Sequence, residues 1–136
     1  MLHGLLSLIR GYDTKLSELE LAIVDALCAN ISDEYCLKLK SRISYVNMIK
    51  RSYGGREVIL YNRRRGVTIF NDDFAISKLP GASKFAKFKI RSNDKMTKNN
   101  GYIILMNGNL ASIEYKNPTE HAEISHIKEI GDIYHR

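Results

Sequence analysis

The dipeptide Asn107-Gly108 is the feature that most restricts how this chain can fold. It stands between two runs rich in isoleucine, leucine and tyrosine, Gly101–Met106 and Asn109–Tyr115. Because Asn and Gly both tolerate the positive φ angles of a type I′ turn, the pattern predicts a tight β-hairpin. It is the strongest hairpin signal in the chain and indicates an antiparallel sheet.

A helix with a complete start signal is predicted near the N-terminus. Ser17 can accept hydrogen bonds from the first free backbone N–H groups, and Glu20 can reach back to complete a capping box. Apolar residues then recur at helical spacing, so we expect a helix over Ser17–Ala29.

A second helix is predicted to begin after Ser32, because Asp33 and Glu34 occupy the turn where the helix dipole favours negative charge. Its apolar face holds Tyr35, Leu39 and Ile43. Lys38, Lys40 and Arg42 are expected to face away from the core or to lie near the C-terminal end. The two helices form a helical hairpin.

Further strands are predicted after these helices. Gly54-Gly55 separates Tyr45–Tyr53 from Arg56–Tyr61, which favours a second hairpin. In the alternative, the second helix continues to Ile49 and ends at the glycines. Two more strands are expected at Val67–Phe70 and at Lys84–Arg91, where apolar and cationic residues alternate.

The C-terminal segment is predicted to be a short helix. Pro118 suits its first turn, Ile124, Ile127 and Ile130 follow, and Gly131 would end it. The whole order predicts an α+β fold, with an N-terminal helical hairpin packed on an antiparallel sheet of about five or six strands. With 136 residues, of which 44% are hydrophobic, we expect one domain spanning residues 1–136.

The cysteines and the N-terminus indicate the compartment. Cys28 and Cys36 do not form a disulfide framework, so we expect reduced core thiols of a cytoplasmic protein. The apolar run Leu2–Ile9 lacks the flanking residues of a signal peptide, and no segment reaches the length of a membrane span. We therefore expect a cytoplasmic protein without a membrane partner.

Groups that would make a catalytic or metal site do not gather in the sequence. His121 and His126 are five residues apart, whereas paired metal ligands on a helix are four apart. Gly54-Gly55 lacks the Lys-Ser/Thr pair that follows a phosphate-binding loop. We expect no enzymatic activity, no metal and no cofactor.

Charge is unevenly distributed along the chain. Residues 38–98 hold sixteen basic and four acidic side chains, a balance of +12, whereas both flanking segments are mildly acidic. Such an asymmetry of charge is informative about binding partners rather than about the fold. The residues that we expect to bind a partner are Arg63, Arg64, Arg65, Tyr61, Arg56, Lys87, Lys89 and Arg91.

Two classes of partner fit this basic block. Basic residues interleaved with tyrosines are what single-stranded nucleic acid requires, although no nucleic-acid-binding module is recognisable. The adjacent arginines Arg63–Arg65, on a connection between strands, instead suit insertion into an acidic cleft of a protein. The pattern is about as compatible with a solvated polar face that binds nothing as it is with either kind of partner.

Two stretches, GREVILYNRRRGVTIF and NGYIILMNGNLASIEYKNPTE, resemble segments of small bacterial immunity proteins, the antidotes of contact-dependent growth inhibition and similar polymorphic toxins. The resemblance covers Gly54–Glu120, rests on strand patterning and identifies no functional residue. It implies a cytoplasmic monomer that forms a heterodimer with a cognate toxin, such as a nuclease, and blocks its active site. The basic middle implies that the toxin is acidic where it docks, or that acidic residues of the predicted helices make the contact.

Overall fold

The computed structural model describes residues 12–91, 98–117 and 126–133. In this part of the chain, helices α2 (Glu18–Cys28) and α3 (Asp33–Tyr45) precede the strands. Strands and short 3-10 turns then follow in this order: β1 (Met48–Arg51), η1 (Tyr53–Gly55), β2 (Glu57–Tyr61), β3 (Arg63–Arg64), β4 (Val67–Thr68), η2 (Asp72–Phe74), β5 (Ala82–Arg91), β6 (Lys98–Met106), β7 (Asn109–Tyr115) and β8 (His126–Ile133).

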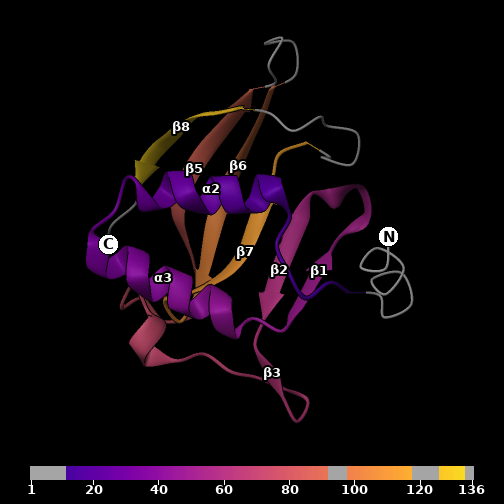
Figure 1. Ribbon diagram of the computed structural model, residues 1–136, viewed down its shortest axis with the longest axis vertical. Helices are drawn as coiled ribbons and strands as arrows, with labels where there is room; N and C mark the ends of the chain where they lie inside the picture. Colours follow the sequence, from indigo (N-terminus) through magenta and orange to yellow (C-terminus); the bar gives the residue numbers. More distant parts are fainter. Residues whose placement is uncertain (1–11, 92–97, 118–125, 134–136) are drawn as a thin grey trace.

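Six strands form one antiparallel sheet in the order β1-β2-β7-β6-β5-β8, and β3 pairs with β4 in a separate two-stranded hairpin. Both helices lie on the same face of the large sheet (Figure 1). The expected α+β fold with a helical hairpin on an antiparallel sheet is therefore confirmed. Among the described residues, no helix covers the opposite face of the sheet.

Both predicted helix starts are confirmed. The Ser17 hydroxyl accepts a hydrogen bond from the backbone N–H of Glu20, and the Glu20 carboxylate accepts one from the backbone N–H of Ser17. The Ser32 hydroxyl likewise accepts from the backbone N–H of Tyr35. Each cap satisfies donors that the first turn of a helix leaves without a partner.

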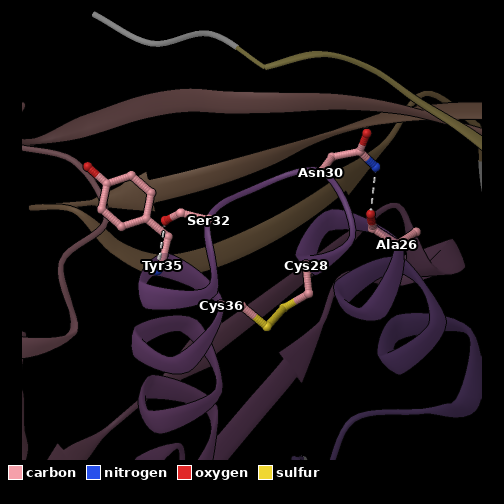
Figure 2. Close-up of a disulfide and its surroundings, with 6 residues drawn as sticks. All are labelled: Ala26, Cys28, Asn30, Ser32, Tyr35 and Cys36. Atoms are coloured by element: carbon pink, nitrogen blue, oxygen red, sulfur yellow. Dashed lines mark hydrogen bonds between the residues drawn. A yellow bond between two sulfur atoms is a disulfide. The ribbon is translucent and has the colours of Figure 1, made fainter.

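The prediction of reduced core thiols is wrong, because Cys28 and Cys36 form a disulfide (Figure 2). Cys28 is the last residue of α2 and Cys36 lies in the first turn of α3. The short turn between the helices brings their Cα atoms to 5.0 Å, within the range that a disulfide spans. Spacing in the sequence did not show this proximity, because it depends on the angle at which the chain reverses.

The β1–β2 hairpin is confirmed over the helical alternative. Helix α3 ends at Tyr45, where Val46 turns to an extended conformation with ψ 125°. The expected strand is shorter at its start, beginning at Met48 rather than Tyr45. Its register pairs Ile49 with Leu60, and both side chains are buried.

The β6–β7 hairpin matches its prediction. Asn107 and Gly108 have φ angles of 48° and 79°, as a type I′ turn requires, and Met106 pairs with Asn109. In the neighbouring strand β5, a register shift between Lys84 and Ala86 turns both Phe85 and Ala86 into the core. The alternation expected for this strand is therefore confirmed, with one bulge in it.

The predicted C-terminal helix is wrong for residues 126–133, which form strand β8 against β5; residues 118–125 lie outside the described residues. Ile127 pairs with Ile90 and Ile130 pairs with Phe88, so four residues of β8 lie opposite three of β5. An irregularity in the pairing absorbs the extra residue. The three-residue spacing of isoleucines therefore imitates a helix although the segment is a strand.

The core lies between the helices and the covered face of the sheet. It combines one stripe from each helix with the inward residues of the central strands: Ile23, Val24, Leu27, Leu39, Ile49, Val58, Leu60, Ile76, Phe85, Ala86, Phe88, Ile90, Ile103, Leu105, Leu110, Ile113 and Tyr115.

Tyr115 brings a polar group into this core. Its ring packs edge-on against the ring of Phe88, with 5.6 Å between the two centroids. Its hydroxyl group is buried and has no hydrogen-bond partner among the described residues. Burial raises the pKa of Tyr115 well above its usual value; the nearby Glu20 carboxylate adds to the rise, and Arg51 opposes it.

Replacing Tyr115 by phenylalanine is expected to raise the free energy of unfolding by about 1 kcal/mol, because it keeps the ring and removes a buried polar group without a partner. Urea unfolding followed by circular dichroism measures the change. Tyr115→Leu is the matched control: it loses the contact with Phe88 and should destabilise the protein. A loss of stability in Tyr115→Phe would show that the hydroxyl has a partner.

Candidate functional site

The three adjacent arginines lie on a small hairpin that projects from the body of the protein beyond the end of the large sheet (Figure 1). Arg63 pairs with Thr68 and Arg64 with Val67, and the turn between them is Arg65-Gly66, with φ angles of 52° and 77°. Both angles are positive, as in a type I′ turn. Strand β4 is thus shorter than the strand expected at Val67–Phe70, and it lies in this hairpin rather than in the large sheet.

Residues 63–67 of the hairpin are all exposed, and Val67 exposes 62% of its surface. Ile69, just beyond the hairpin, exposes 39%. The projecting surface therefore combines guanidinium groups with two β-branched apolar side chains. Arginine and apolar groups together are typical of the anchoring residues in protein interfaces. The sequence pattern predicted a strand at Val67–Phe70 and did not indicate that Val67 and Ile69 are exposed.

The base of the hairpin is fixed by hydrogen bonds to the body. The Asn47 side chain donates to the Arg63 carbonyl at 2.8 Å and accepts from the Arg63 N–H at 2.9 Å. The Ile69 N–H donates to the Asn62 carbonyl at 2.8 Å. These contacts order the hairpin before any partner arrives, which lowers the entropy lost on binding.

Arg42 anchors the same region from inside: it lies in the last turn of α3, one of the two placements expected for it, but it does not face away from the core. It lies in α3 and exposes only 1% of its surface. Its Nε donates to the Leu110 carbonyl at 3.0 Å, and its two terminal nitrogens donate to the Ile69 and Leu60 carbonyls at 3.3 and 3.2 Å. A fork of donors can satisfy three carbonyls that converge at strand ends, which an apolar side chain cannot do.

The guanidinium of Arg42 is buried with carbonyl oxygens around it, and it lies 5.5 Å from the centre of the Phe70 ring. Burial lowers the pKa of Arg42 to about 10. The residue remains protonated at neutral pH, and we infer that its role is structural. Helical spacing grouped Arg42 with Lys38 and Lys40. The sequence does not show which backbone carbonyls remain without a hydrogen-bond donor in the folded protein, so it did not indicate a buried role for Arg42.

Two of the three hairpin arginines are available to a partner. Arg63 donates to the Gly66 carbonyl at 3.0 Å and lies 6.0 Å from the centre of the Tyr61 ring. Within the described residues, Arg64 and Arg65 form no hydrogen bond or ion pair through their side chains. Arg64 and Arg65 are therefore the groups that can dock without breaking a contact first.

Three of the other predicted residues lie together at the opposite end of the sheet. Arg56, Lys87 and Lys89 line one groove of about 470 Å³, together with Tyr102 and Lys116. Tyr61 and Arg56 stand at the two ends of β2, five residues apart, or about 16 Å along a strand. The expected binding residues thus fall into two groups. Arg91 is the last residue of β5 and pairs with Lys98. Its side chain lies outside the described part of the structure.

The basic residues between positions 38 and 98 do not lie on one continuous face. Lys38 and Lys40 lie on α3, on the helical side. Arg51 turns toward the helices, where it forms a two-pronged contact with Glu20 and an ion pair with Asp13 at 2.6 Å. The register explains this, because Arg51 pairs with the core residue Val58.

Residues for metal binding do not converge in the described part of the chain, where no group of three histidine, cysteine or acidic side chains is found. His121, named in the sequence, lies outside the described residues, and His126 begins strand β8. Among the residues described, no helix is both long and apolar enough to cross a bilayer.

Comparison with known proteins adds no relative: no protein-family model, no curated protein and no solved structure matches this chain at a significant level.

Proposed function

We propose that this protein is a non-enzymatic inhibitor that docks on an acidic site of another protein by its β3–β4 hairpin. In its most specific form the proposal is an immunity protein that binds a cognate toxin, such as a nuclease, and blocks its active site. The observation that carries the proposal is the projecting hairpin, which presents Arg64 and Arg65 beside exposed Val67. The implied complex is a heterodimer formed from a monomer.

Three physical features support docking rather than solvation of this hairpin. It is ordered in advance by Asn47 and Arg42, so little flexibility is lost on binding. Its guanidiniums can form paired hydrogen bonds with carboxylates, which lysines cannot. Its exposed apolar side chains gain from burial only when a partner covers them.

The proposal places the protein in the cytoplasm, where thiols are kept reduced. It therefore requires that the fold persists when the bond between Cys28 and Cys36 is absent.

Affinity capture from the producing cells tests the proposal. Tagged wild-type protein is used as bait with and without nuclease treatment, beside an Arg64→Glu/Arg65→Glu variant, and bound proteins are identified by mass spectrometry. We expect one stoichiometric protein that survives nuclease and is lost with the charge-reversed hairpin. The control is Lys40→Glu, at an exposed position of α3, and this variant should still capture the same protein.

Two results would contradict the proposal. One is that no stoichiometric protein remains after nuclease treatment, so that every captured protein was held through a nucleic-acid bridge. The other is a stoichiometric partner that binds the wild type and the hairpin variant equally well, which would place the contact elsewhere.

A further inference from the structure

We propose that the protein has a second binding site, for single-stranded nucleic acid, over β5 and β6 on the face of the sheet opposite helices α2 and α3. This site is distinct from the hairpin and does not depend on the proposed inhibitor function. It is centred on Tyr102, a half-buried residue in the middle of β6. Its lysines come from β5, the neighbouring strand.

The strand register places this set of residues on one face. Lys87 pairs with Tyr102, Lys89 with Asn100, and Lys84 with Ile104. Residues that alternate with these, such as Phe88 and Ile103, are buried toward the helices. The lysines and the tyrosine therefore lie together on the face that the helices do not cover.

Tyr102 is positioned as a stacking platform. The Lys84 ammonium lies 4.2 Å from the centre of its ring, which is within the range of a cation–π contact. Lys87 stands directly opposite on the neighbouring strand. An aromatic ring beside cations is the arrangement by which proteins stack a base and neutralise the adjacent phosphates.

Two hollows meet at Tyr102. One, of about 470 Å³, is lined by Lys87, Lys89 and Asn100. The other, of about 490 Å³, is lined by Lys84, Leu79 and Pro80. Tyr102 lines both hollows. A linear chain can thus follow β5 with a base in each hollow and its phosphates near the lysines.

Charge defines the course of that chain. Lys84, Lys87 and Lys89 follow one another along β5, with no acidic residue between them. On the other side of β6, Glu114 pairs with Tyr102 and with Glu57, and it lines the hollow of about 470 Å³ together with Arg56 and Lys116. Four cations and one carboxylate therefore line that hollow, and the row of lysines on β5 gives a polyanion its course along the strand. The combination of ring, hollows and cations favours a nucleic acid over an acidic peptide, which has no bases to stack.

Fluorescence anisotropy with labelled oligo-dT and oligo-U of twelve nucleotides tests this site, over a range of salt concentrations. We expect affinity to fall with salt with a logarithmic slope of about −2, as expected for roughly three phosphate contacts on a single strand. Unlabelled duplex should compete more weakly than unlabelled single strand.

Variants separate this site from the rest of the surface. Tyr102→Ala is expected to weaken binding about 10-fold, and Tyr102→Phe, which keeps the ring, should restore it. Lys87→Glu or Lys89→Glu should weaken binding and flatten the salt dependence. The matched control Lys40→Glu and the hairpin variant Arg64→Glu/Arg65→Glu should bind almost as the wild type does.

Three results would overturn the inference. The first is that neither oligonucleotide binds at low salt. The second is that Lys89→Glu and Lys40→Glu lose the same amount of affinity for the oligonucleotides. The third is that polyglutamate displaces the labelled oligonucleotide as effectively as unlabelled oligo-dT does. Circular dichroism of each variant shows whether it is folded. Because the hairpin variant is measured in the same experiment, failure of this site leaves the docking proposal untouched.

Discussion

Replacing Arg42 by methionine is expected to lower the free energy of unfolding by about 3 kcal/mol. The change leaves the buried Leu60 and Leu110 carbonyls, and the partly buried Ile69 carbonyl, without their donor. Each lost partner of a buried polar group costs about 1–3 kcal/mol, and removal of a buried charge offsets part of the sum. Arg42→Lys should also be destabilising, because one ammonium cannot reach three separated carbonyls.

Urea unfolding measures this loss, and Lys40→Met on the exposed side of the same helix is the matched control. The control should change the free energy of unfolding by less than about 0.5 kcal/mol. Hydrogen exchange at the Ile69 N–H should become faster in Arg42→Met, since the base of the hairpin is loosened. An Arg42→Met protein as stable as the wild type would contradict the structural role assigned to this residue.

Reduction of the disulfide is expected to lower the free energy of unfolding by about 2.5 kcal/mol and the melting temperature by about 10 °C. Cys28 and Cys36 close a short loop, and by loop-closure entropy a loop of this length contributes roughly that amount. Differential scanning fluorimetry with and without dithiothreitol measures the shift. A domain of ordinary stability, about 5–15 kcal/mol, would still fold after this loss.

The Cys28→Ala/Cys36→Ala variant is the control for this experiment. It should melt near the temperature of the reduced wild type and should not respond to dithiothreitol. A wild-type melting temperature unaffected by dithiothreitol would contradict a stabilising disulfide. Unfolding of the reduced protein at 37 °C would contradict the proposed cytoplasmic function.

Local signals of the sequence were sufficient for most of the fold. The caps at Ser17 and Ser32 and the turn at Asn107-Gly108 act over a few residues, so their side-chain chemistry predicts the structure directly. The last strand was misread because its isoleucines are spaced as in a helix. Only the pairing of β8 with β5, which shifts in register along its length, shows why that spacing fits a strand.

The candidate sites depended on contacts that local signals do not contain. The sequence singled out the hairpin arginines as a candidate site, because three adjacent guanidiniums stand on a connection between strands; their binding role stays a prediction. Tyr102 was not among the expected binding residues, since its position among lysines follows from the pairing of β6 with β5. Arg42 and Arg51 were grouped with the surface cations, although one satisfies buried carbonyls and the other pairs with Glu20.

An alanine scan against the captured partner tests the docking proposal most directly. Isothermal titration calorimetry measures the dissociation constant for Arg63, Arg64, Arg65, Arg56, Lys87 and Lys89, each replaced by alanine. We expect Arg64→Ala or Arg65→Ala to raise it about 30-fold, or about 2 kcal/mol, while the three groove residues change it less than about twofold. An even loss across all six positions, or no loss at Arg64 and Arg65, would contradict docking by the hairpin.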